Sequence, residues 1–145
     1  MPYKLITGVT TYNRINYLKR FVASWEKTTS GESTLIIADD GSKDGTIEYI
    51  KTISSNKIIP IFNNRVGVAA QTNTIFKKSL EIGFDYGFKA DDDIWFIKSE
   101  WEDLYINNIK KSGYDHLCYQ NKKWVGSRRD VVTKDGLKTN LCVLR

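Results

Sequence analysis

The sequence predicts an α/β fold in which a mainly parallel sheet carries helices on both faces. Short runs of apolar and β-branched residues alternate along the chain with segments whose apolar residues recur at helical spacing. This alternation favours right-handed crossovers, which place successive strands in parallel. The chain has 145 residues, of which 41% are hydrophobic and 27% charged, the length and composition of one soluble globular domain.

The first predicted strand covers residues 5–10, and a helix is expected after it. The strand is apolar and β-branched, and it runs into a polar loop that begins at Thr10. Asn13 or Asn16 is available to cap the helix. Four apolar residues share one helical face and are expected in the core: Leu18, Phe21, Val22 and Trp25.

The second predicted strand covers residues 34–38. It is a short apolar run, as expected for a parallel strand covered on both faces, and it ends at Asp39 and Asp40. The glycines of the next segment permit a tight turn, and Asp44 or Thr46 can cap the helix that follows. The apolar face of that helix begins with Ile47 and Ile50.

The same strand and helix pattern then recurs. Residues 57–62 read as a third strand, residues 63–67 as a loop, and the following helix is stopped by Gly83. A fourth strand, residues 86–90, runs directly into three consecutive aspartates. The residues expected to mark the apolar face of the third helix are Val68, Ala69, Ile75, Phe76 and Leu80.

The pattern weakens towards the end of the chain. A further helix closed by Gly113 and a fifth strand at residues 116–120 are expected. Residues 122–145 hold seven of the 22 Lys and Arg residues but two of the 17 Asp and Glu residues. We therefore expect a nucleotide-binding α/β domain at residues 1–121 and a basic segment at residues 122–145. The residues of the last helical stripe are Trp101, Leu104, Tyr105 and Ile109.

The uneven charge leaves several partners open for the basic segment. It can contact phosphates, an anionic membrane surface or an acidic partner, or it can be a solvated terminus. No apolar stretch approaches the roughly 18 residues that span a bilayer, and no signal peptide is recognisable, so a cytoplasmic location is expected. Peripheral association with a membrane, through contact of the basic segment with anionic lipids, is an alternative.

Four polar clusters follow the four predicted strands. In open parallel sheets, ligands bind in the crevice beyond the carboxyl ends of the strands, so these clusters are expected to meet at one edge. They are Thr10–Asn13, Asp39–Asp40, Asn63–Arg65 and Asp91–Asp93.

The acidic run Asp91–Asp93 carries the strongest chemical signal. Three adjacent carboxylates at a partly buried strand end repel one another and need a compensating positive charge. Oxygen-only ligation by carboxylates suits Mg²⁺ or Mn²⁺, and Mg²⁺ is usually held by one or two carboxylates together with substrate phosphates. The run therefore predicts a metal–diphosphate site, whereas the structural alternative is an acidic turn that caps the following segment.

Four motifs together resemble a known family. "VTTYNR", "ADDGSKDGT", "NNRVGVAAQTN" and "KADDDIWF" follow the four predicted strands, and they match the order and spacing of the family-2 glycosyltransferases of the GT-A, Rossmann-like fold. The resemblance covers roughly the first 120 residues. It implies transfer of a sugar from a nucleotide-diphosphate sugar, with a UDP-sugar as the first expectation, to a saccharide, lipid-linked or protein acceptor.

The resemblance also implies roles for individual residues in the first two loops. Thr10 and Tyr12 fall where the family contacts the base, in the same loop as Arg14. Asp40 falls where a carboxylate reads the base edge, and Asp39 supports it.

The later motifs imply the remaining contacts. Arg65 is expected at the phosphates because Thr72 stands where many relatives carry an arginine, just before Asn73 of the nucleotide site. Trp95, beside the carboxylates, is expected to contact the sugar.

The acidic run falls on the DXD region of the family, which contacts the ribose and holds Mn²⁺ or Mg²⁺ against the diphosphate. Alignment on Asp93-Ile94-Trp95 puts Ala90 where many relatives have the first acid. A simple DXD reading takes Asp91 and Asp93, whereas we place Asp92 and Asp93 nearest the metal and Asp91 beside them, at the nucleotide.

The catalytic base is not identified in this sequence. The family normally adds a second, acceptor-binding half, so the base is expected beyond Arg145 and residues 122–145 are expected to begin a truncated acceptor region. His116, the single histidine, has no identified partner and is left out of the site.

Two rival classes remain, and two others are set aside. A non-catalytic module that binds nucleotide sugars is the main alternative, and a basic nucleic-acid-binding domain ranks lower, so no nucleic-acid partner is expected. A phosphotransferase would need a nucleophilic aspartate after the first strand, and a dehydrogenase would need G-x-G-x-x-G there; this sequence has neither.

Overall fold

The computed structural model describes residues 3–119, 131–132, 138–139 and 141–142. The chain forms two compact units, Met1–Glu100 and Trp101–Arg145. The predicted boundary between residues 121 and 122 lies outside the described residues and stays a prediction.

The first unit is built on a four-stranded sheet with the order β3-β2-β1-β4. All three pairs of neighbouring strands are parallel, as the alternating pattern predicted. The strands are β1 (Lys4–Thr11), β2 (Glu32–Asp39), β3 (Ile58–Phe62) and β4 (Tyr86–Asp91), and the helices of this unit are α1 (Ile15–Thr28), α2 (Thr46–Ile53) and α3 (Val68–Ile82).

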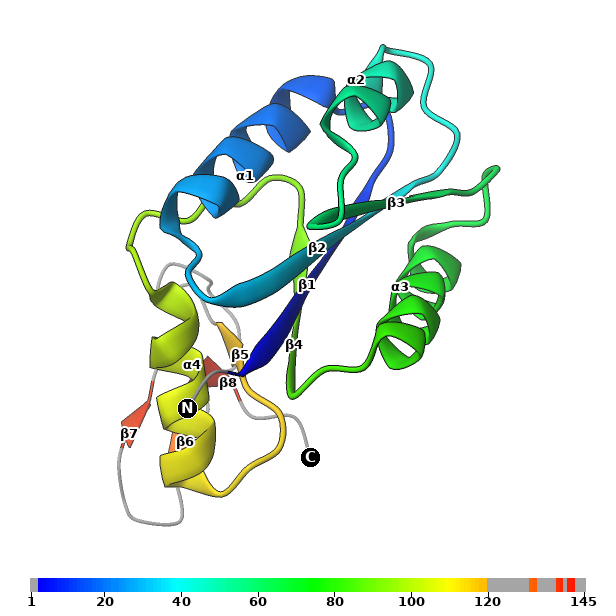
Figure 1. The fold of residues 1–145 in the computed structure, drawn as a ribbon. Helices are drawn as coiled ribbons and strands as arrows, with labels where there is room; N and C mark the ends of the chain where they lie inside the picture. Colours follow the sequence, from blue (N-terminus) through cyan, green and yellow to red (C-terminus); the bar gives the residue numbers. More distant parts are fainter. Residues whose placement is uncertain (1–2, 120–130, 133–137, 140, 143–145) are drawn as a thin grey trace. The chain divides into compact units, whose positions relative to one another are not determined.

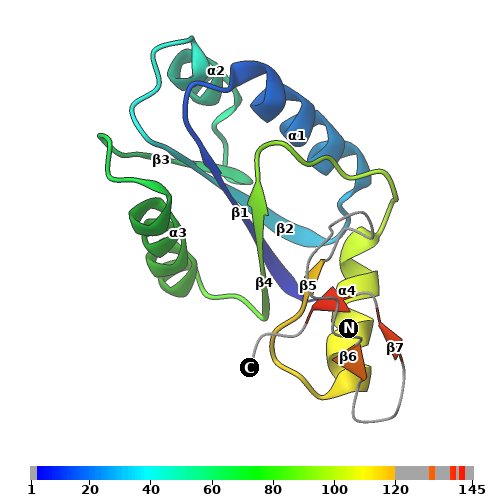
Figure 2. The same cartoon turned by 180° about the vertical axis from the view of Figure 1, so that it is seen from behind.

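Helices cover both faces of this sheet, which confirms the predicted architecture. Figures 1 and 2 show α1 and α2 on one side of the strands and α3 on the other. On the first side, the Trp25 indole of α1 donates a hydrogen bond to the Thr7 hydroxyl of β1 over 3.0 Å. On the other side, Ile75 of α3 packs with Ile6, Ile36 and Ala38 in one buried cluster.

Gly8 allows β1 and α3 to approach closely. A Cβ atom at this position would collide with the Cγ2 methyl group of Ile75. The next residue of the strand, Val9, belongs to the opposite face of the sheet and is fully buried. Leu18 and Phe21 of α1 are also fully buried. Both sides of β1 are therefore filled with core side chains, as expected for a central parallel strand.

The start of α1 corrects the expected cap. Neither Asn13 nor Asn16 caps the helix; the Asn13 side chain instead accepts a hydrogen bond from the Lys43 amide over 2.7 Å. The first amide of α1, that of Ile15, donates to the Asp44 carboxylate over 3.0 Å. The same carboxylate accepts from the Thr46 amide over 3.2 Å, so Asp44 bonds the first amide of both helices, although the N-cap position of α2 is Gly45.

The buried face of α3 differs from the predicted one. Ile75 is buried as predicted, but Val68, Phe76 and Leu80 of the expected stripe are 62%, 52% and 74% exposed. The buried residues of α3 are Gln71, Ile75 and Ser79, which recur every four residues. The large side chain of this inner face, Ile75, packs where Gly8 of β1 leaves room for it.

The second unit contains α4 (Trp101–Ser112) and two short antiparallel pairs. Leu104 of the predicted stripe is 53% exposed, whereas Trp101 and Ile106 are buried. The expected fifth strand is present only as β5 (Cys118–Tyr119), which pairs antiparallel with β8 (Leu141–Cys142) and is not part of the parallel sheet. The other pair joins β6 (Val131–Val132) to β7 (Lys138–Thr139).

Most of the predicted basic segment lies outside the described residues; of its seven basic residues only Lys138 is placed, in β7. None of the helices in the described part of the chain has the length and apolar content required to cross a bilayer.

Candidate functional site

The polar clusters that follow the strands meet at one edge of the sheet. Strand register places Thr11 beside Asp39 and Thr10 beside Asp91. The amide of Asp40 donates to the carbonyl of Thr11 over 3.1 Å, so the second cluster adjoins the first. The predicted convergence at the carboxyl ends of the strands is therefore confirmed.

A cavity of about 250 Å³ opens at this edge. Its walls come from the end of β1, the first turn of α3 and the acidic run after β4. Six residues predicted for the site line it, namely Thr10, Tyr12, Arg14, Asp91, Asp92 and Asp93, together with Thr11, Val68 and Gln71.

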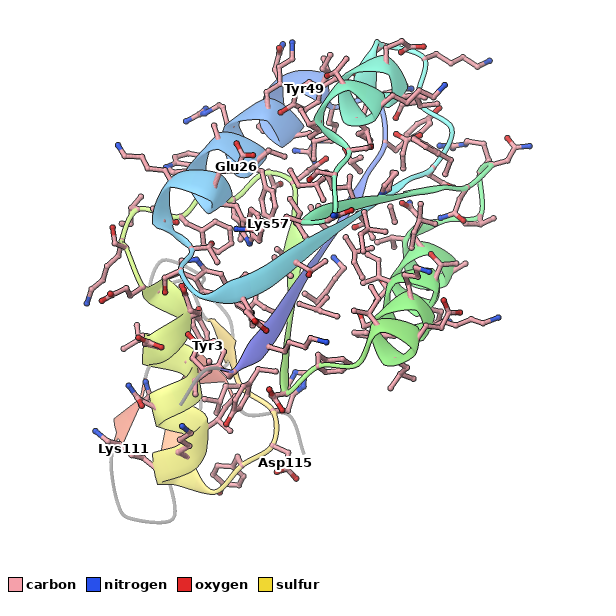
Figure 3. The ribbon with its side chains drawn as sticks, viewed as in Figure 1. Tyr3, Glu26, Tyr49, Lys57, Lys111 and Asp115 are labelled. Carbon is pink, nitrogen blue, oxygen red and sulfur yellow. The ribbon has the colours of Figure 1, made fainter. Side chains whose placement is uncertain are left out.

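A second hollow of about 290 Å³ lies at the opposite, amino-terminal ends of β2 and β3. Its lining includes Glu26 of α1 and Lys57 just before β3, which are labelled in Figure 3. It is slightly larger, but it lacks convergent carboxylates. Ligands of parallel sheets bind at the carboxyl ends of the strands, so the chemistry favours the first cavity despite its smaller volume.

Asp92 is the buried member of the acidic run. It is 3% exposed, and it accepts a hydrogen bond of 2.7 Å from the Thr11 hydroxyl. Burial raises the pKa of Asp92 above its usual range, and the Thr11 hydrogen bond and the Arg14 charge offset only part of that effect.

Basic side chains of the protein itself compensate the acidic run. The Arg14 guanidinium lies 3.2 Å from the Asp92 carboxylate and 3.3 Å from that of Asp93, and Lys89 lies 3.1 Å from Asp91. Although burial opposes its charge, the two aspartates keep the pKa of Arg14 above its usual value. The sequence argument assigned this compensation to a metal ion alone, and in that respect it was incomplete.

Asp39 and Asp40 are fully engaged with the backbone of the neighbouring loops. Asp39 accepts hydrogen bonds of 2.9 Å from the amides of Gly41 and Ser42. The two oxygens of Asp40 accept from the amides of Val66 and Gly67 over 2.7 and 2.9 Å. Both carboxylates therefore shape the loops at the edge, and neither lines the cavity.

The remaining predicted residues lie outside the cavity lining. The Arg65 guanidinium stacks over the Tyr12 ring at 3.9 Å from its centroid, next to the cavity. Asn73 is exposed on α3, two positions after the cavity residue Gln71. Trp95 is 49% exposed, and the Arg20 guanidinium covers its ring at 4.1 Å. Their binding roles stay predictions.

Three residues of the cavity were not predicted for the site: Thr11, Gln71 and Val68, the last of which was expected only on the apolar face of the helix. Thr11 positions the buried Asp92, and its signal was present, because it lies within the polar cluster after the first strand. Gln71 is 4% exposed in the cavity wall. It lies one helical turn before Ile75. The four-residue spacing of Gln71, Ile75 and Ser79 marks the inner face of α3, but the larger apolar residues of the helix drew the prediction elsewhere.

The donor set fits a hard divalent cation in part. Among the described residues no group of three or more His, Cys, Asp or Glu side chains is arranged to hold a metal ion. The cavity nevertheless has three aspartates in its lining, and their carboxylates offer oxygen ligands. One or two carboxylates suffice for Mg²⁺ when substrate phosphates complete the coordination, so the acids fit a cation that is bound together with a diphosphate.

Fold and site together define the class of protein: this is a Rossmann-like α/β domain of the GT-A type. S. aureus TarS (residues 1–349) has a TM-score of 0.66 with 20% identity, over 89% of this chain and 39% of TarS. The mannosyltransferase PcManGT from Pyrobaculum calidifontis, solved with GDP-Man and Mn²⁺, has a TM-score of 0.65 with 16% identity, over 85% of this chain and 36% of PcManGT.

Sequence comparison then identifies the family. The profile of "Glycosyl transferase family 2" matches residues 7–136, and the chain belongs to this family. An uncharacterized glycosyltransferase of Acanthamoeba polyphaga mimivirus is 23% identical over 123 residues. That match covers 80% of this chain and 48% of the viral protein, so the chain spans about half the length of this relative.

Proposed function

We propose that this chain binds the donor substrate of a glycosyltransferase, a nucleotide-diphosphate sugar, together with Mn²⁺ or Mg²⁺. The observation that carries the proposal is the cavity at the carboxyl ends of the strands, in which Asp91, Asp92 and Asp93 face the end of β1. TarS has been solved with UDP-GlcNAc, and PcManGT with GDP-Man and Mn²⁺, which supports this class of ligand.

We assign a separate binding role to each residue of the cavity. Asp92 and Asp93 hold the cation against the diphosphate, with Asp91 towards the ribose, and Thr10 and Tyr12 contact the nucleoside. Thr11 keeps Asp92 in place through its hydroxyl. A bound divalent cation supplies Lewis-acid neutralisation of the charge on the departing nucleoside diphosphate. Arg14, whose side chain is 40% exposed, can turn from the aspartates to the phosphates.

The acceptor, the catalytic base and the location in the cell stay predictions. An acceptor hydroxyl needs a general base on its own path, and none of the described residues is assigned to that role. We propose a UDP-sugar as the donor and a saccharide, lipid-linked or protein acceptor. We also propose a cytoplasmic location with peripheral membrane contact.

Thermal unfolding with added ligand tests the proposal. UDP with Mn²⁺ should raise the melting temperature by roughly 5 °C or more at a hundredfold excess over Kd, because a ligand that binds only the folded state stabilises it. Chelation of the metal should abolish the gain. Asp92→Asn and Asp93→Asn should each remove the metal dependence while the protein stays folded.

The test also separates a transferase from a binding module. Binding without turnover is the second candidate, because no general base is assigned among the described residues. Release of UDP from UDP-sugars, with or without sugar transfer, would identify an enzyme, whereas ligand-induced stabilisation without turnover would identify a binding module. An unchanged melting temperature with UDP, GDP and either metal would contradict both.

A further inference from the structure

Gln71 lines the candidate cavity, and its side chain holds a buried oxygen without a hydrogen-bond partner among the described residues. The residue is 4% exposed and lines the cavity, and its Oε1 atom is buried without a hydrogen bond to any described residue. A buried amide atom without a partner is unfavourable in the free protein, so it requires an explanation.

Other buried polar side chains near this one have partners. The Thr11 hydroxyl donates to Asp92, and both oxygens of Asp40 accept backbone amides. Further along the inner face of α3, the Ser79 hydroxyl donates to the Ile75 carbonyl over 2.8 Å. Gln71 differs from them in that its side-chain oxygen, on a helix that packs on the sheet, accepts no hydrogen bond from a described residue.

The chemistry of the group indicates what it can recognise. A carboxamide is neutral and offers one acceptor atom and one donor group, so it does not compensate phosphate charge as Arg14 can. Its buried oxygen requires a hydrogen-bond donor. A sugar nucleotide offers such donors in its hydroxyl groups and in the ring N–H of its base, whereas a fully ionised pyrophosphate offers none.

We propose that Gln71 is a specificity-determining residue that accepts a hydrogen bond from a neutral hydroxyl or ring N–H group of the sugar nucleotide. The inference rests on the proposed function and adds a contact to it. The donor group belongs either to the nucleoside or to the transferred sugar. A site that is built to bond a polar group of its substrate discriminates strongly against compounds that lack this group.

Calorimetry with three probes tests the proposal and separates the two sources. Inorganic pyrophosphate, UDP and UDP-GlcNAc are titrated into the protein in the presence of Mn²⁺. Gln71→Leu, which keeps the approximate size but not the amide, should weaken binding roughly tenfold. A loss seen already with UDP assigns the contact to the nucleoside, and a loss seen only with UDP-GlcNAc assigns it to the sugar. Pyrophosphate should bind as tightly as before.

Matched variants keep the result interpretable. Ser79→Ala removes a buried polar group from the same face of α3, but its hydroxyl is already bonded and lies outside the cavity lining, so all three affinities should stay unchanged. Gln71→Met, with an unbranched side chain, should reproduce the effect of leucine. The melting temperature of each variant without ligand shows that it is folded.

Two results overturn the inference while the proposed function stands. Gln71→Leu binds all three probes like the unmodified protein, in which case Gln71 only packs, or it loses pyrophosphate and UDP equally, in which case it acts on the phosphates. If the unmodified protein binds none of the three probes, the proposed function fails and this inference fails with it.

Discussion

At the scale of single residues, Asp92 carries a conflict between stability and binding. Burial raises the pKa of its carboxyl group, which means that the charged form is less favourable in the folded protein than in the unfolded chain. At neutral pH the ionised Asp92 therefore lowers the free energy of unfolding. A cation bound with the nucleotide would relieve this cost.

Asp92→Asn should consequently raise the melting temperature of the ligand-free protein at pH 7, by roughly 2 °C. Asparagine keeps an oxygen that can accept the Thr11 hydrogen bond but carries no charge. Because the folded pKa is the raised one, the advantage should be present at pH values above it. It should shrink as the pH falls and disappear below about pH 4, where aspartate is protonated in both states.

Thermal unfolding of both proteins between pH 7 and pH 4 measures this difference. Asp93→Asn is the matched control, since its side chain is 49% exposed and should show little change across the same range. A ligand-free Asp92→Asn variant that is less stable than the unmodified protein at pH 7 would contradict the assignment of Asp92 as a strained carboxylate.

Site residues were predictable from the sequence where their motif lies at the end of a strand. Thr10, Tyr12, Arg14 and the three aspartates follow strands that are readable from their apolar runs, and all six line one cavity. The pairing of Arg14 with Asp92 and Asp93 was not predictable, because it joins residues 78 and 79 positions apart through side-chain rotamers. Gln71 was missed because its neighbours Val68 and Phe76 are larger and more apolar.

At the scale of secondary-structure elements, the close approach of β1 and α3 depends on Gly8. Gly8→Ala should lower the free energy of unfolding by about 2 kcal/mol, because the new methyl group collides with Cγ2 of Ile75 and forces the helix outwards. Chemical denaturation measures the change. The two substitutions Gly8→Ala and Ile75→Ala should be non-additive, because Ile75→Ala removes the atom that the new methyl group meets.

Gly87→Ala provides the control for this substitution. Gly87 lies in β4 beside Ile6 of β1, and its added methyl group would meet the ring of Phe84 at 3.3 Å. That ring is 38% exposed and has room to move, so the cost should be smaller than at Gly8. Equal losses for the two alanine variants would contradict the proposed role of the β1–α3 approach.

The elements also show where hydrophobic periodicity succeeds and fails. Leu18, Phe21, Val22 and Trp25 of α1 are all buried as predicted, because this helix packs with large side chains against a face of the sheet. In α3 only Ile75 of the predicted apolar residues is buried, against Gly8 of β1, whereas Val68, Phe76 and Leu80 are exposed. Periodicity alone cannot distinguish these cases, since it does not report the distance between a helix and its sheet.

At the scale of the whole molecule, the candidate site belongs to one unit. All strands of the parallel sheet, α1 to α3 and every residue of the cavity lining lie within Met1–Glu100. A fragment of residues 1–100 should therefore fold and should keep the stabilisation by UDP and Mn²⁺.

Circular dichroism during heating, with and without ligand, checks this expectation. The same fragment with Asp92→Asn should unfold cooperatively but should show no ligand-dependent gain. A fragment that folds and yet fails to respond to UDP and Mn²⁺ would show that residues after Glu100 contribute to binding.

The bonds from Asp40 to the amides of Val66 and Gly67 have a consequence for the energetics of recognition. They join the loop after β2 to the loop after β3 before any nucleotide arrives, so little chain entropy remains to be lost on binding. Both amide protons belong to exposed residues that precede a helix, yet they should exchange slowly with deuterium in the empty protein. Two hydrogen bonds of one buried carboxylate thus help to preorganise this edge of the sheet.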